Sequence, residues 1–77
     1  MVAIAKGIYR HNKSMRLYEV VGIAHQTEGG EPLVVYRPLY ESADFQLFAR
    51  PYLMFVEKVT VGDEIVPRFE KVLDAVA

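Results

Sequence analysis

The pattern of apolar and polar positions along the chain indicates a series of short β-strands. The densest β-forming run, PLVVYRPLY at positions 32–40, predicts a central strand. Residues 7–11 alternate apolar with polar side chains, which is the period of a half-buried strand. Residues 15–26 predict a longer strand that is apolar on both faces. Gly22 interrupts this strand and indicates a β-bulge or a close backbone approach.

Two adjacent glycines separate the second and third of these runs. Gly29-Gly30 predicts a hairpin, because a two-residue turn needs the positive φ angles that glycine adopts at low cost. The two runs should therefore pair antiparallel. A turn confined to the glycines would place Tyr36 opposite Ile23, and a longer loop would shift that register.

The second half of the chain contains further turn signals. Residues 41–44 predict a polar loop, and residues 45–50 a short strand that ends at an Arg-Pro step. Pro51 favours one helical turn over residues 51–55, with Phe55 and either Leu53 or Met54 in the core.

Two further strands are expected between residues 56 and 66, joined by a turn at Gly62-Asp63. From residue 67 the period changes, and apolar residues recur at i, i+3, i+4 and i+7, which predicts an amphipathic helix over residues 67–77. The apolar stripe consists of Phe69, Val72, Leu73 and Val76. Since so short a helix is unstable alone, it should either cap its own barrel, which we favour, or dock on a second chain.

The chain has 77 residues, a length that corresponds to one domain over residues 1–77. About five short strands with tight turns predict a mainly β fold, an SH3-like and partly open barrel over residues 7–66. A domain of this size buries only about 60% of its unfolded surface. With no cysteine and 52% hydrophobic residues, the sequence is compatible with both a monomer and a homodimer.

Five motifs are spread over most of the chain, and their combination is specific. They are GIYRH at 7–11, YEVVGIAHQTE at 18–28, LVVYRPLY at 33–40, ARPYLMFVEKV at 49–59 and VPRF at 66–69. Together they resemble DUF1653, a family of small bacterial proteins of unknown function. The resemblance implies a small β-rich, SH3-like fold and a cytoplasmic protein, and it implies no activity.

Composition lowers the expectation of several functions. The net charge is −1, so bulk charge predicts neither nucleic-acid nor membrane binding, and no segment approaches the length of a membrane span. Without cysteine, the two histidines cannot supply the three or four ligands of a metal site, and we expect no metal or cofactor. The hydroxyl residues lie in turns without a nucleophile elbow. We therefore expect a binding module in the cytoplasm and place an enzyme third.

Arginine adjoins an aromatic or imidazole side chain in three places. Both Arg-Pro steps favour extended backbone at a strand end, so Arg37 and Arg50 are predicted on the same side of the barrel, partly exposed. A guanidinium offers a planar fork for phosphate or carboxylate, and tyrosine offers a stacking face. The candidate ligand-binding residues are Tyr9, Arg10, His11, Tyr36, Arg37, Arg50 and Tyr52.

Two functional hypotheses follow from these residues. The first is recognition of an anionic ligand, a nucleic acid or a nucleotide, by Arg10, His11, Arg37 and Arg50. The second is a protein-interaction module that uses a tyrosine groove or the C-terminal apolar stripe. The simpler alternative is that the tyrosines pack in the core while the arginines form ion pairs with nearby glutamates.

Overall fold

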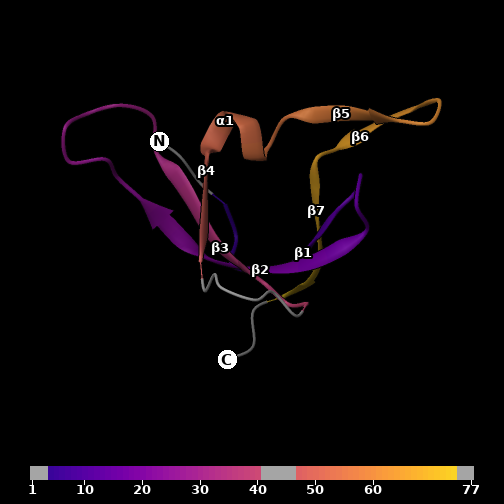
Figure 1. Ribbon diagram of the computed structural model, residues 1–77, viewed down its shortest axis with the longest axis horizontal. Coiled ribbons are helices and arrows are strands. Elements are labelled where there is room, and N and C mark those ends of the chain that lie inside the picture. Colours follow the sequence, from indigo (N-terminus) through magenta and orange to yellow (C-terminus); the bar gives the residue numbers. More distant parts are fainter. Residues whose placement is uncertain (1–3, 41–46, 75–77) are drawn as a thin grey trace.

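The computed structural model describes residues 4–40 and 47–74, and this part of the chain is mainly β. It forms a five-stranded sheet in the order β4-β3-β2-β1-β7 and a two-stranded sheet of β5 and β6. Figure 1 shows the main sheet curving beneath α1 and the β5–β6 hairpin. The elements are β1 (Gly7–His11), β2 (Arg16–Ala24), β3 (Leu33–Pro38), β4 (Phe48–Pro51), α1 (Tyr52–Phe55), β5 (Lys58–Val61), β6 (Glu64–Pro67) and β7 (Phe69–Asp74).

The expected barrel is not closed within the described residues. The main sheet ends at β4 on one edge and at β7 on the other, and these two strands do not pair with each other. The all-β prediction is therefore confirmed, whereas the SH3-like arrangement stays a prediction. The strands predicted at residues 7–11 and on either side of Gly62-Asp63 are confirmed, and Gly62 has the positive φ of 62° that its turn requires.

Strands β2 and β3 pair antiparallel, which confirms the predicted hairpin, and of the two alternatives for its turn the structure has the longer loop. The connection runs over residues 25–32, so Ile23 faces Val34, and Tyr36 faces Val20. Pro32 lacks the amide hydrogen that would continue the ladder, which favours the longer loop. The register shifts between Val20 and Gly22, which confirms the irregularity expected at that glycine.

The two glycines shape the loop rather than a two-residue turn. Gly29 and Gly30 have φ angles of 90° and 115°, and the Gly29 amide donates to the Gln26 carbonyl oxygen over 3.0 Å. The Gln26 side-chain amide donates to the Glu31 carbonyl oxygen over 2.8 Å and closes the loop. The positive φ values that the sequence required are thus present, inside a wider connection.

The predicted C-terminal helix is wrong over the described residues. Phe69–Asp74 is strand β7, which pairs antiparallel with β1, and Phe69 lies opposite His11. The register shifts where Ile8 faces Leu73 and Tyr9 faces Lys71, so one extra residue lies in β7. Phe69 is buried while Val72 and Leu73 are exposed, so the apolar residues of the predicted stripe are not buried together. Pairing with an open edge of β1 supplies backbone hydrogen bonds that a marginal helix could not match.

Because Phe69–Asp74 forms a strand, the chain does not divide into a barrel over residues 7–66 and a helical tail, as the sequence suggested. Strand β7 completes the main sheet, so neither a capping helix nor a helix-mediated dimer can be built from it. Val76 lies outside the described residues. The loop expected at residues 41–44 and the first residues of the strand expected at 45–50 lie outside them as well.

The core lies on the inner face of the main sheet and is largely aromatic. Its buried hydrophobic residues are Tyr9, Tyr18, Val20, Val34, Tyr36, Phe55 and Phe69. The helical turn α1 follows Pro51, as predicted, and carries Phe55 into this core with 1% of its surface exposed. Leu53 and Met54 remain exposed, so neither fills the core position expected for one of them.

The Phe69 ring contacts aromatic side chains from several elements of the core. It stacks on Phe55 with ring centres 4.1 Å apart and planes 5° from parallel. Tyr18 and Tyr36 meet the same ring edge to face, at 5.7 and 5.4 Å. Phe69 therefore joins the end of the main sheet to α1, and aromatic pairs of this kind contribute beyond their buried area.

We predict that Phe69→Ala lowers the free energy of unfolding by about 3–5 kcal/mol, because it removes a buried ring and leaves a cavity. Leu73→Ala is the matched control in the same strand: Leu73 is 63% exposed, so its loss should change stability by less than about 0.5 kcal/mol. Urea denaturation measures both. Phe69→Leu provides an intermediate value if the alanine variant fails to fold. Equal stabilities for the two alanine variants would contradict this view of the core.

Candidate functional site

The structure separates the two arginines that the sequence placed together. Arg50 lies opposite Val34 across β3 and β4, and its Nε donates to the buried Tyr36 hydroxyl over 3.1 Å. Arg37 lies opposite Glu19 and donates its Nε to that carboxylate over 2.6 Å. Because side chains alternate along a strand, Arg37 and Val34 belong to opposite faces. The predicted common side is therefore wrong.

Arg10 also lies on the outer face of the sheet. It stands opposite Leu17 on β2 and Glu70 on β7, and its Nη2 contacts the Glu70 carboxylate at 3.1 Å. The structure thus places Arg10 and Arg37 outside and Arg50 inside, so the four cationic residues proposed from sequence do not form one site.

The candidate tyrosines belong mainly to the core. Tyr9 and Tyr36 are buried, as the simpler alternative holds. The Tyr9 hydroxyl donates to the Ala5 carbonyl oxygen over 2.7 Å, and burial raises the pKa of this phenol, against an opposing effect of Lys71. Tyr52 is half-buried against the core, with its amide donating to the Pro32 carbonyl oxygen over 2.9 Å. These rings are not free stacking platforms.

A different group of cations gathers at the inner face, and we call it the arginine–histidine cluster. It consists of His11, Arg16 and Arg50. His11 lies opposite Arg16 on β2, and its ring meets the Phe69 ring edge to face at 4.8 Å. The Arg50 guanidinium carbon is 5.5 Å from the centre of the same ring. His11 and Arg50 therefore both contact the Phe69 ring.

Arg16 is linked to the rest of the cluster by Tyr40 and Tyr18. Its guanidinium carbon lies 4.3 Å from the Tyr40 ring centre, a cation–π contact. The Tyr40 and Tyr18 hydroxyl oxygens share a hydrogen bond of 3.0 Å. Burial, followed by this hydrogen bond, raises the pKa of Tyr18 to about 12, so its phenol stays neutral at ordinary pH. The Tyr18 ring therefore supplies no compensating negative charge.

Ion pairing distinguishes the inner arginines from the others. Arg10, Arg37 and Arg68 each contact a glutamate carboxylate within 3.1 Å. Arg16 and Arg50 form no ion pair with a carboxylate of the described residues. Within residues 4–40 and 47–74, the inner face therefore has two positive charges that lie against rings and have no carboxylate partner.

Burial and the positive charges near His11 lower its pKa. Burial lowers the pKa of its imidazole below 6.5, and the charges of Arg50, Arg68 and Lys13 lower it further, against a smaller opposing effect of a backbone hydrogen bond. The Ser14 amide donates to His11 Nδ1 over 3.2 Å, which favours the neutral tautomer protonated at Nε2. A neutral His11 can still donate one hydrogen bond to an anion.

Arg16 contributes to the cluster although it is not among the candidate residues chosen from the sequence. A sequence signal for Arg16 was present: Arg16, Tyr18 and Val20 alternate in phase, so an arginine occupies the apolar face of β2.

In the described part of the chain no three His, Cys, Asp or Glu side chains gather as metal ligands. Across the same residues no helix has the length and apolar character needed to cross a membrane.

Comparisons with known proteins agree on one family. Residues 7–71 match the family described as "Protein of unknown function (DUF1653)". The crystal structure of a DUF1653 protein from Bordetella bronchiseptica is similar, with 31% sequence identity and a TM-score of 0.84 over 96% of this chain and 94% of that one. No curated protein matches the chain. The resemblance based on the five motifs is thereby confirmed.

We predict that the His11 pKa lies below 6.5 in the folded protein and rises in Arg50→Gln, which removes one of the nearby positive charges. Because the unfolded imidazole binds its proton more readily, the free energy of unfolding should fall as pH decreases from about 6.5 towards the folded pKa. An NMR titration of the imidazole measures both variants. Arg37→Gln, on the outer face, is the control and should leave the midpoint unchanged. A wild-type midpoint at or above 6.5 would contradict the assignment.

Proposed function

The chain belongs to the DUF1653 family, and from that premise we propose that it is a binding module for a phosphate-bearing anion. The ligand contacts Arg16, Arg50 and His11 on the inner face. One observation carries the proposal: both arginines are held against aromatic rings without a carboxylate partner in the described residues. An oxyanion would supply the missing negative charge.

The arrangement suits an anion because the cations are already oriented. Arg50 is held by the Tyr36 hydroxyl and the Phe69 ring, and Arg16 lies over Tyr40. A guanidinium that is fixed in this way loses little side-chain freedom on binding. Charge-assisted hydrogen bonds to a phosphate are also about twice as strong as neutral ones.

The proposed ligand is defined by its phosphate, with a nucleotide or a short single-stranded nucleic acid as its source. The core tyrosines are engaged in edge-to-face contacts, so the module does not depend on stacking a base against Tyr9 or Tyr36. Arg10 and Arg37, which the sequence included, face outward in ion pairs and take no part.

The protein-interaction alternative has less support. A tyrosine groove would need exposed rings, whereas Tyr9, Tyr18 and Tyr36 are buried. The apolar helix that formed the second half of this alternative is replaced by β7. A cytoplasmic location, an SH3-like closure and a homodimer remain predictions.

We predict that Arg16→Ala and Arg50→Ala each weaken binding of AMP and of a short oligothymidylate about three- to tenfold, because each removes one charge-assisted contact. Isothermal titration at two or more salt concentrations measures this effect. Affinity should fall steeply with salt, and each variant should reduce the salt slope by about 1. Comparing AMP with inorganic phosphate tests whether the phosphate alone is recognised.

Arg37→Ala is the matched control, since it removes an arginine from the outer face and leaves the arginine–histidine cluster intact. Its affinity should equal that of the wild type. Equal weakening by Arg37→Ala and Arg50→Ala, or an affinity that does not change with salt, would overturn the proposed site. Salt-independent binding would instead indicate apolar docking.

A further inference from the structure

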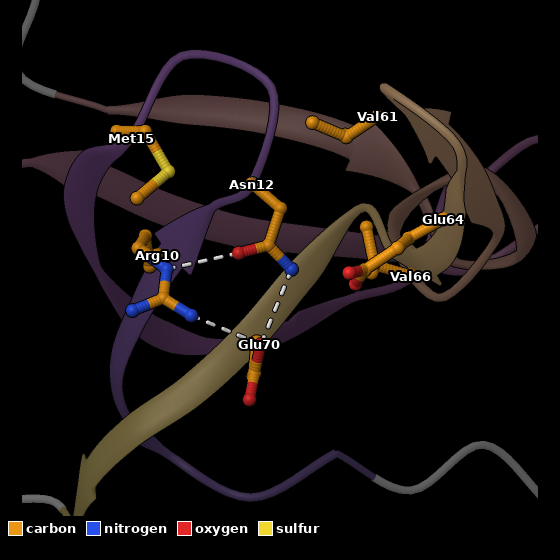
Figure 2. Close-up of a pocket in the computed structure, with 7 residues that line it drawn as sticks. All are labelled: Arg10, Asn12, Met15, Val61, Glu64, Val66 and Glu70. Atoms are coloured by element: carbon orange, nitrogen blue, oxygen red, sulfur yellow. Dashed lines mark hydrogen bonds and ion pairs between the residues drawn. The ribbon is translucent and has the colours of Figure 1, made fainter.

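A pocket of about 380 Å³ lies apart from the inner face, between the end of β1, the β1–β2 turn, the β5–β6 hairpin and β7 (Figure 2). Its volume is within the range of small-ligand sites. The residues that line it are Arg10, Asn12, Met15, Val61, Glu64, Val66 and Glu70. Two of them, Arg10 and Glu70, face each other on the outer side of the sheet.

The floor of the pocket is a fixed polar network. Asn12 is 7% exposed, and its Nδ2 donates to the Pro67 carbonyl oxygen over 2.8 Å and to Glu70 Oε1 over 3.3 Å. Its Oδ1 accepts from Arg10 Nε at 2.9 Å, while Arg10 Nη2 contacts Glu70 Oε1 at 3.1 Å. Glu70 and Arg10 are therefore oriented before any ligand arrives.

The charge of the pocket favours a cation. It contains one guanidinium, already paired with Glu70, and a second carboxylate, Glu64, which has no ion-pair partner in the described residues. Figure 2 shows the Glu64 carboxylate directed into the pocket, towards Asn12 and Glu70. The formal charge is thus −1, and an anion would meet two carboxylates. A cation would be attracted by both.

The remaining wall is apolar and includes a strained residue. Met15, Val61 and Val66 provide aliphatic surface beside the two carboxylates. Met15 has φ of 64°, a left-handed conformation that is rare and unfavourable for a side chain other than glycine. Its amide donates to the His11 carbonyl oxygen over 2.7 Å, while the side chain is 63% exposed at the rim. The flexible thioether of Met15 adds adaptable apolar surface at this rim.

We propose that this pocket binds an alkylammonium group, a protonated amine on an aliphatic stem. The ammonium lies between Glu64 and Glu70, and the methylenes lie along Val61, Val66 and Met15. A lysine side chain and a linear polyamine share this chemistry. The proposal does not depend on the anion-binding function, which uses none of these residues.

The test is an NMR titration of the full ¹⁵N-labelled chain with two amines, Nα-acetyl-lysine methylamide and spermidine. We expect saturable shifts at amides of the pocket residues with both. The Nε-acetylated lysine derivative keeps the stem and loses the charge, so its affinity should be at least tenfold lower. Tighter binding of spermidine would assign a free polyamine, and tighter binding of the lysine derivative would assign a peptide side chain.

Two variants locate the site. Glu64→Gln should weaken binding of both amines about three- to tenfold, because the uncharged amide no longer attracts the ammonium. Met15→Gly should weaken binding while the protein stays folded, since glycine adopts the left-handed turn freely.

Glu28→Gln is the matched control, with the same charge change in the β2–β3 loop at the other end of the molecule, and it should bind as the wild type does (Figure 1). Three results would overturn the proposal: no saturable shift with either amine, equal affinity for the acetylated derivative, or unchanged affinity in Glu64→Gln.

Discussion

The stacking of Phe55 on Phe69 is the contact on which the rest of the structure depends. A chain of 77 residues without cysteine has no disulfides and depends strongly on burying apolar surface, and large rings bury the most surface for each residue. One ring comes from the helical turn α1 and the other from the last strand of the main sheet. Their contact therefore joins the helical turn to the edge of the main sheet over the inner face.

The start of strand β7 is held for this contact by the buried Asn12, in addition to the ladder between β7 and β1. The Asn12 amide donates to the Arg68 carbonyl oxygen over 2.9 Å, and its side chain donates to the Pro67 carbonyl oxygen. These bonds hold the start of β7 beside the end of β1. Because side chains alternate, Phe69 then enters the core while Glu70 faces the outer pocket. Asn12 therefore helps to position Phe69, which contacts the arginine–histidine cluster, and Glu70, which lines the outer pocket.

The same alternation explains the distribution of charge. Outward-facing arginines meet glutamates on neighbouring strands, as Arg37 meets Glu19 and Arg10 meets Glu70. The inward-facing Arg16 and Arg50 meet rings instead. Burial and the charges of Arg50, Arg68 and Lys13 lower the pKa of His11, and an anionic ligand would offset the repulsion among these charges. In the described part of the chain, the inner face therefore carries two arginine charges without a carboxylate partner beside the aromatic core.

The sequence by itself determined the elements that depend on neighbouring residues: the strand at 7–11, the irregularity at Gly22, the helical turn after Pro51 and the turn at Gly62. Local backbone preference decides each of these. The tertiary structure decided what depends on distant partners. β7 became a strand because β1 offered an open edge, and the loop length between β2 and β3 set the register. The faces of Arg37 and Arg50 followed from cross-strand register, which a pattern read along one strand does not contain.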